Sequence, residues 1–207
     1  EATPYQQVPD VFTQVAEAAP EALFATCYLF NRDFLLRIVK RLKAIRPSCL
    51  VILGGPEFWG DNEVFLRTTP AVDAVGRGEG EHIISHVLHS AKDKTRSWHD
   101  IPGMCWISAD GTYCDNGTAA VSGEAMQDML PASEDPFFDF SKPFQQIETS
   151  RGCNGQCRFC TSPLLPSTRT FPMARIRQEL NMLSKKNIQE GRVVDRTFNQ
   201  NTERSVQ

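Results

Sequence analysis

The sequence predicts an α/β protein, in which a partial doubly wound parallel sheet is followed by the first βα units of a second α/β domain. Three observations predict this fold. Apolar runs of strand length alternate with amphipathic helical periods over residues 22–92, glycine-rich turns follow two of the runs, and the alternation restarts after residue 144. Short connections between such elements favour parallel strands, right-handed crossovers and helices on both faces of the sheet.

The first elements are marked by a change of period. A compact apolar run over residues 22–30 predicts a strand, and residues 32–46, with apolar side chains on one face and basic ones opposite, predict a helix. The remaining elements of this part follow in order: a strand over residues 49–53, a short helix over 61–67, a strand over 72–76 and a helix over 81–92.

Two glycine-rich turns, Gly54-Gly55 and residues 76–81, follow predicted strands. In a parallel sheet, ligands bind beyond the carboxyl ends of the strands, where glycines let the backbone approach them. No Lys-Ser or Lys-Thr follows the glycines, and two glutamates in the second turn would repel phosphate, so a nucleoside triphosphate is not expected. Ordinary βα turns that need a positive φ explain the same glycines equally well.

A hairpin is predicted after the first α/β part, because two strand-like runs flank an Asp-Gly pair at residues 110–111. If these two residues form the turn, Cys105 faces Asn116 and lies diagonally from Cys114, at a separation longer than a disulfide prefers. Both thiols are therefore expected to be free. Residues 117–144 follow as a linker whose apolar anchor is the phenylalanine cluster of residues 137–140.

An α/β pattern restarts in the last part, with strands over residues 144–149 and 192–195 around a helix over 172–186. The side chains expected on the buried face of that helix are Met173, Ile176, Leu180 and Leu183. A (β/α)8 barrel needs about 250 residues, so the sequence is expected to end inside a fold. The predicted domains are residues 1–97, a hairpin and linker over 98–143, and residues 144–207.

Composition narrows the classes of function. The 207 residues carry 22 Lys and Arg against 25 Asp and Glu, a formal net charge of -3, so a nucleic-acid partner is not expected. No apolar stretch is long enough for a membrane span, and no signal peptide is recognisable. The expected location is cytoplasmic.

Three of the seven cysteines, Cys153, Cys157 and Cys160, form a C-x3-C-x2-C run. Clustered thiolates indicate soft-metal ligation, either zinc or iron and sulfur. A structural zinc needs a fourth ligand, and neither Cys nor His occurs after Cys160. On a cubane cluster, three thiolates leave the fourth iron open to an exogenous ligand.

The spacing of this run resembles that of the radical S-adenosylmethionine (SAM) superfamily. The resemblance implies a 4Fe-4S cluster on Cys153, Cys157 and Cys160, SAM chelated to the open iron, and a (β/α) TIM-like barrel. It also implies reductive cleavage of SAM to a 5'-deoxyadenosyl radical, with Phe159 beside the adenine. The expected partners are an electron donor of the flavodoxin or ferredoxin type and an unknown small-molecule or peptide substrate.

The first half resembles the Rossmann-like cobalamin-binding domain that precedes this barrel in one branch of the superfamily. The resemblance rests on residues 25–28, the Leu53–Glu57 turn and the Arg77–Glu81 loop. The cobalamin contacts that it implies are Thr26, Gly54, Gly55, Glu57, Gly78, Glu79 and Gly80. The first strand of such domains and their Asp-x-His-x-x-Gly segment are missing, so cobalt ligation by histidine is not expected.

Residues 147–153 are also typical of that branch, and residues 194–199 look like its second barrel strand. The superfamily's Gly-Gly-Glu motif is absent there, and Asp195 and Asn199 are candidates for polar contacts to SAM. A solvent-facing strand end explains both residues at least as well.

The reaction that the resemblance implies first is radical methyl transfer with cobalamin, and radical rearrangement, cyclisation and methylthiolation use the same scaffold. Two other classes stay open: a non-catalytic zinc or iron-sulfur module with an α/β interaction scaffold, and a chain that is inactive by itself. His82, His86 and His89 share one helix face, which indicates a solvated face more than a metal site.

Overall fold

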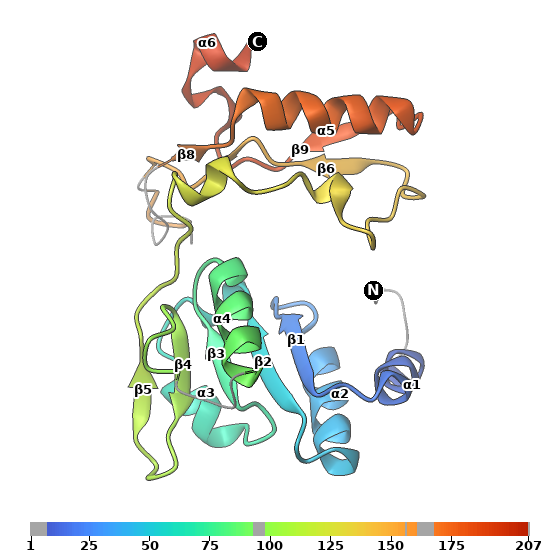
Figure 1. The fold of residues 1–207 in the computed structure, drawn as a ribbon. Coiled ribbons are helices and arrows are strands. Elements are labelled where there is room, and N and C mark those ends of the chain that lie inside the picture. Colours follow the sequence, from blue (N-terminus) through green and yellow to red (C-terminus); the bar gives the residue numbers. More distant parts are fainter. Residues whose placement is uncertain (1–7, 93–97, 156, 161–167, 207) are drawn as a thin grey trace. The chain divides into compact units, whose positions relative to one another are not determined.

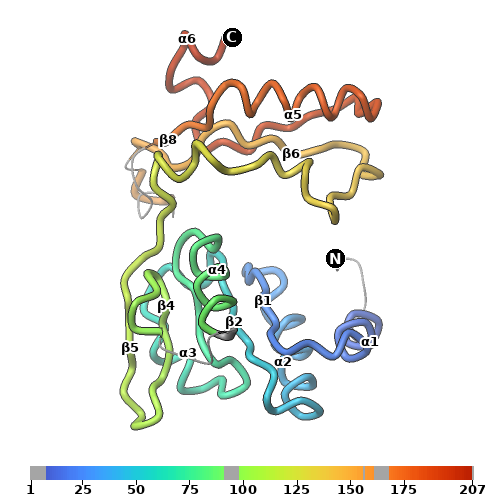
Figure 2. Tube along the Cα trace, in the orientation of Figure 1, coloured from blue at the N-terminus to red at the C-terminus, as the bar shows by residue number. Residues whose placement is uncertain are grey.

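A computed structural model describes residues 8–92, 98–155, 157–160 and 168–206. The chain forms two compact units, Glu1–Ala119 and Ala120–Gln207, and each is treated separately (Figures 1 and 2). Among the described residues, no helix combines the length and the apolar character that a membrane span requires.

The first unit is built on a five-stranded sheet with the order β1-β2-β3-β4-β5. Its strands are β1 (Ala22–Thr26), β2 (Leu50–Gly54), β3 (Ala74–Gly76), β4 (Met104–Ile107) and β5 (Tyr113–Asp115). Strands β1, β2 and β3 run parallel, whereas β4 and β5 are antiparallel. The predicted α/β fold with a parallel sheet is confirmed. The hairpin extends this sheet, so the first unit runs to Ala119 and not to the predicted limit at residue 97.

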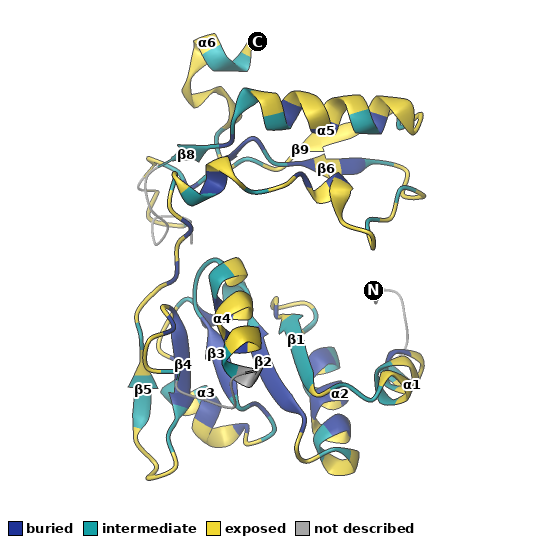
Figure 3. Cartoon of the chain, viewed as in Figure 1, coloured by how far each residue is buried: buried dark blue, intermediate teal, exposed yellow. Residues whose placement is uncertain are grey.

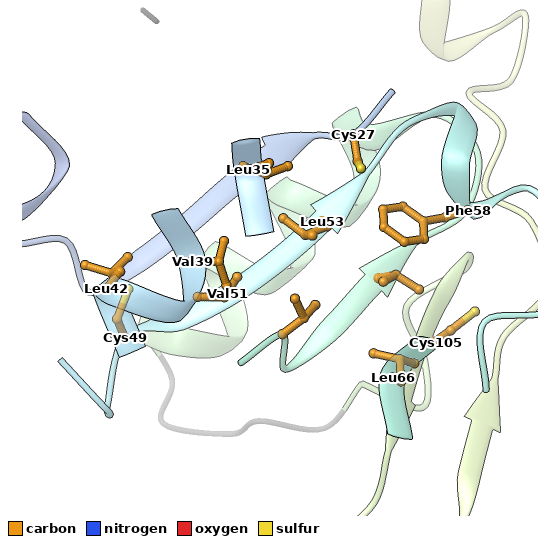
Figure 4. Packing of buried hydrophobic residues seen from close by; sticks show 12 residues of the cluster. Cys27, Leu35, Val39, Leu42, Cys49, Val51, Leu53, Phe58, Leu66 and Cys105 are labelled. Carbon is orange, nitrogen blue, oxygen red and sulfur yellow. The ribbon is translucent and has the colours of Figure 1, made fainter. Parts of the chain in front are cut away.

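Helices cover both faces of this sheet (Figure 1). They are α1 (Val8–Ala18), α2 (Arg32–Ile45), α3 (Glu63–Thr68) and α4 (Gly80–Lys92). On the face of α2 and α3, Leu42 packs in one cluster with Val51 and Leu53 (Figure 4). On the face of α4, Ile83 and Val87 pack in a second cluster that includes Ile52 and Trp106. Each buried aliphatic side chain contributes about 1.5–3 kcal/mol, so the sheet is anchored from both sides.

The first strand ends earlier than the sequence predicts. Strand β1 stops at Thr26, and the next residues, Tyr28, Leu29 and Phe30, are exposed. The side chain of Asn31 shapes this turn, because it accepts a hydrogen bond from the Tyr28 N–H (2.8 Å) and donates one to the Thr26 carbonyl (3.0 Å). Apolar composition predicted the strand, and the asparagine side chain ends it.

The predicted register of the hairpin is wrong by one residue. Cys105 pairs with Asp115 and Trp106 pairs with Cys114. The loop has three residues instead of two, because Gly111 adopts φ 84° and bulges after a turn closed by the Gly111 N–H and the Ser108 carbonyl. Cys105 and Cys114 consequently face opposite sides of the sheet. Both are free thiols, as expected.

The second unit contains one complete parallel βαβ connection. Its elements are β6 (Gln145–Ile147), β7 (Ser150–Arg151), β8 (Arg169–Thr170), α5 (Met173–Lys185), β9 (Gly191–Val193) and α6 (Thr202–Ser205). β6 pairs with β9 in parallel on either side of α5 in the sequence, and β7 pairs with β8 in an antiparallel hairpin. The predicted restart of a βα pattern is confirmed.

The core of the second unit differs from the prediction in two places. Phe137 is 89% exposed, and Val121 and Met126 instead pack with Phe171 in the core. On α5, Leu180 is 48% exposed, whereas Glu179 is buried. Exposed and buried stretches alternate along this helix (Figure 3). The Ser133 N–H and the Arg175 guanidinium face the Glu179 carboxylate, and its burial nevertheless raises the pKa of Glu179.

Candidate functional site

A cavity of about 330 Å³ opens at the carboxyl ends of β1, β2 and β3. This is the edge where a parallel sheet binds its ligands. Its lining is mostly glycine backbone and aliphatic side chains: Phe24, Ala25, Thr26, Ile52, Leu53, Gly54, Gly55, Gly76, Gly78, Gly80, Ile83 and Ile84. Five of the predicted cobalamin contacts, Thr26, Gly54, Gly55, Gly78 and Gly80, therefore meet at one cavity.

Two of these glycines hold backbone conformations that a side chain would prevent. Gly55 has φ 102°, and a Cβ there would lie 2.6 Å from the Cys27 carbonyl oxygen. Gly78 has φ 104°, and a Cβ there would lie 2.1 Å from the Ala119 carbonyl oxygen. Because real Cβ contacts are never this short, the cavity wall depends on glycine at both positions.

The two predicted glutamates lie elsewhere. The Glu57 carboxylate is 3.8 Å from the Arg32 guanidinium. Burial, followed by the nearby Glu57 carboxylate, raises the pKa of the Cys27 thiol to about 11. Glu79 donates its backbone N–H to the Ala119 carbonyl (3.0 Å). Their prediction as cobalamin contacts stays a prediction.

The cysteine loop follows β7 in the second unit. The Cys153 Sγ is 3.3 Å from the Gly155 N–H and 3.4 Å from the Thr197 Oγ1. Hydrogen bonds from Thr197 and then Gly155 lower the pKa of Cys153, so the thiolate form is favoured. A Cβ on Gly155 would lie 3.3 Å from the Cys153 Sγ and 3.8 Å from the Cys157 Sγ, which places both sulfurs around this glycine.

The rest of the loop is more open. Cys157 is exposed, and its carbonyl accepts the Cys160 N–H (3.1 Å). Phe159, the predicted neighbour of the SAM adenine, is 94% exposed. Gln156 and residues 161–167 lie outside the described residues. Within the described ranges, no three or more His, Cys, Asp or Glu side chains are gathered as a metal site.

Asp195 joins the ends of the two parallel strands of the second unit. Its carboxylate accepts hydrogen bonds from the Thr149 N–H (2.7 Å), the Thr149 hydroxyl and the Ser150 hydroxyl (2.6 Å). The sequence did not predict this set of hydrogen bonds, which links the segment after β9 to the base of the cysteine loop. Asn199 is exposed in a 3-10 turn over residues 198–200. Their contact with SAM stays a prediction.

The three histidines of α4 have local partners. The His86 Nδ1 is 2.7 Å from the His82 carbonyl, and the His89 Nδ1 is 2.7 Å from the Ser85 carbonyl. They form no metal group among the described residues. A solvated helix face, the simpler of the two interpretations, accounts for this arrangement.

Comparisons with known proteins find relatives of this chain. Residues 2–88 match the family model described as the B12 binding domain. The uncharacterized methyltransferase PH0819 of Pyrococcus horikoshii is 29% identical over 184 residues, which are 82% of this chain and 38% of that protein. The cobalamin-dependent radical SAM methyltransferase TokK of Streptomyces tokunonensis is 24% identical over 196 residues, which are 86% of this chain and 28% of TokK.

Among solved structures, the cobalamin-dependent S-adenosylmethionine radical enzyme OxsB with aqua-cobalamin and S-adenosylmethionine bound has the same fold. It aligns with a TM-score of 0.78 and 16% identity over 94% of this chain and 28% of OxsB. The chain thus spans less than half the length of each of these relatives. Residues 2–88 are thus similar to a B12 binding domain, and the chain as a whole is similar to part of cobalamin-dependent radical SAM proteins.

Proposed function

We propose that this chain binds cobalamin at the glycine-lined cavity and a 4Fe-4S cluster with SAM at the cysteine loop, as part of an enzyme for radical methyl transfer. The observation that carries the proposal is the cavity at the ends of β1, β2 and β3, inside the residues matched to the B12 binding domain. The methyltransferases among the relatives support the reaction class.

The residues of the cavity fit a large, mostly uncharged organic group. Glycine backbone at Gly54, Gly55 and Gly78 leaves room for close approach, and the Thr26 side chain stands at the end of β1. The lining also includes the aliphatic side chains Ile83 and Ile84 of α4, which would exclude water from a cofactor tail bound there. Bound here, cobalamin would supply the methyl group for transfer.

The cysteine loop fits a cluster by the chemistry of its donors. Cys153, Cys157 and Cys160 lie on one short loop, and thiolate sulfur is the ligand that iron-sulfur clusters prefer. Bound to these three residues, the cluster would supply the electron that cleaves SAM. The exposed ring of Phe159 is available to stack on the adenine.

The other residues of the second unit would position this loop. Asp195 fixes the backbone where β6 ends, and Thr197 holds the Cys153 sulfur. An electron donor of the flavodoxin or ferredoxin type and a small-molecule or peptide substrate complete the proposed reaction.

The test has two arms on the full 207-residue chain. In the first, aquacobalamin is titrated and followed by its visible absorbance, and Gly55→Ala serves as the variant that fills the cavity wall. In the second, anaerobic reconstitution with iron and sulfide is followed by low-temperature EPR with and without SAM. Retained cobalamin and a cubane signal that shifts with SAM support the proposal.

Failure would take a specific form in each arm. If the chain does not retain aquacobalamin, the proposed binding of cobalamin by the first unit is refuted. A chain that takes up zinc and never forms a cluster refutes the radical reaction, and it supports a non-catalytic metal-binding module in its place.

A further inference from the structure

Backbone hydrogen bonds join the loop after β3 to the hairpin segment, defined here as residues 103–119. The Arg77 N–H donates to the Gly103 carbonyl (2.8 Å), and the Ala119 N–H donates to the Arg77 carbonyl (2.9 Å). The Glu79 N–H returns a hydrogen bond to the Ala119 carbonyl (3.0 Å), so Gly78 and Ala119 form a parallel bridge. The hairpin segment lies beyond the residues matched to the B12 binding domain.

The backbones at this contact leave no room for side chains. A Cβ on Gly78 would lie 2.1 Å from the Ala119 carbonyl oxygen. A Cβ on Gly103 would lie 2.4 Å from the Arg77 carbonyl oxygen, and Gly103 adopts φ 79°. Glycines on both sides of the contact therefore allow three backbone segments to pack directly against one another.

One ion pair fastens the same loop to the outer strand of the hairpin. The Arg77 guanidinium donates to both carboxylate oxygens of Asp115, at 3.0 and 2.9 Å. It also donates to the Gly60 carbonyl (2.8 Å), and its side chain is 11% exposed. Burial favours the neutral acid, but hydrogen bonds from Arg77 and from the Gly117 N–H lower the pKa of Asp115 below its usual value. The Arg77 side chain is thus largely buried, whereas the Asp115 side chain is 34% exposed. A bidentate pair with one buried partner constrains geometry more than a single contact between two exposed side chains.

We propose that Arg77 and Asp115 are positioning residues for cobalamin, and that the hairpin segment is part of the cobalamin-binding unit. The inference rests on the proposed function of the cavity. Gly78 and Gly80 line that cavity, and a glycine-rich loop without support samples many conformations. Because the ion pair and the bridge hold the loop in one conformation before the ligand arrives, they raise the affinity for it.

The test compares four versions of the 207-residue chain by titration with aquacobalamin: wild type, Asp115→Asn, Arg77→Lys and Arg67→Ala. Arg67 is the matched control, because it also forms an ion pair, with Glu63 (2.7 Å), and also donates to the hairpin, at the Gly111 carbonyl (3.1 Å), without contacting the loop. We expect a dissociation constant about tenfold higher for the two variants of the pair. We expect less than about a twofold change for the control.

Each result separates the two proposals. A wild type that binds no aquacobalamin refutes the proposed function. Equal binding by all four chains leaves that function intact and overturns the positioning role.

A second measurement covers the case in which both variants of the pair fail to fold, as judged by thermal unfolding. Amide hydrogen exchange of the wild type is then recorded with and without aquacobalamin. We expect slower exchange of the Glu79 and Ala119 amides in the presence of aquacobalamin, because their hydrogen bonds hold the loop that contacts it. Unchanged exchange at both amides overturns the inference.

Discussion

The two candidate sites are made from different parts of the chain. The cavity of the first unit is lined by glycine backbone, at Gly54, Gly55 and Gly78, and by aliphatic side chains, at the edge of a sheet packed on both faces. The cysteine loop of the second unit is made from side chains, and the Cys157 side chain is exposed. Close backbone packing at Gly55 and Gly78 shapes the first site. The second site consists of cysteine side chains on one loop, and in the described part of the chain no three His, Cys, Asp or Glu side chains are gathered as a metal site.

The sharpest test of this contrast is the removal of one thiol. Cys157→Ala is expected to abolish iron and sulfide retention after anaerobic reconstitution, because a cluster bound by three thiolates loses a ligand. The thermal unfolding temperature should stay unchanged, since Cys157 is exposed. Cys114→Ser, which changes a thiol of the first unit, is the matched control and should retain iron. Full iron retention by Cys157→Ala would remove the cysteine loop as the cluster site.

At the cavity of the first unit, by contrast, a substitution should lower both stability and ligand binding. Gly78→Ala is expected to destabilise the chain by about 3 kcal/mol or more and to abolish aquacobalamin binding, because its Cβ would lie 2.1 Å from the Ala119 carbonyl oxygen. Gly111→Ala is the control, since Gly111 also has a positive φ of 84° but nothing within 4 Å. Its cost should be about 1–2 kcal/mol, measured by urea unfolding. Equal costs at both positions would contradict the close-packed wall.

Removal of the Asp195 hydrogen bonds at the base of the cysteine loop should give the next largest effect. Asp195→Ala removes the acceptor of hydrogen bonds from Thr149 and Ser150, both of which are buried. We expect a loss of about 2–3 kcal/mol in the stability of the second unit, followed by thermal unfolding. Asp139→Ala is the control, because the Asp139 carboxylate is exposed and accepts hydrogen bonds from nearby Ser141. It should cost about 0.5 kcal/mol or less.

The smallest expected effect is a pH dependence of the free energy of unfolding, caused by the buried Cys27 thiol next to the cavity residue Thr26. Burial and Glu57 raise the pKa of the Cys27 thiol to about 11, so the folded chain holds this proton more tightly than the unfolded chain. Stability from this thiol is complete below the unfolded pKa of about 8.5–9 and is lost as the pH rises toward 11. The loss should reach about 2 kcal/mol, and Cys27→Ala should remove it from urea unfolding curves at pH 8 to 11. Identical alkaline slopes for the two chains would contradict the assignment.

The sequence predicts what depends on periodicity and on residue type. Apolar runs identify β1 and β2, and the glycines at the ends of β2 and β3 identify the cavity. The three cysteines are recognisable by spacing, because soft-metal chemistry requires that residue type. In both cases a local pattern carries the information.

Features that depend on one tertiary contact escape this reasoning. An Asp-Gly pair suits two-residue and three-residue turns equally, so the bulge at Gly111 could not be distinguished. Helical periodicity places Leu180 inside, but Arg175 and the Ser133 N–H draw Glu179 into the core instead. The polar residue Asp195 looks like a ligand contact in sequence, and its partners lie 46 and 45 residues away.

The bridge between Gly78 and Ala119 also affects the order in which parts of the chain can fold during synthesis. All three parallel strands are complete once Gly76 has been synthesised, but the partners of Arg77 lie 38 and 40 residues later, at Asp115 and Gly117. Chains fold from the N-terminus as they emerge during synthesis. A nascent chain that contains all of residues 2–88 would therefore still lack the contacts that hold the loop after β3. Cofactor binding would then begin only after the hairpin segment has left the ribosome.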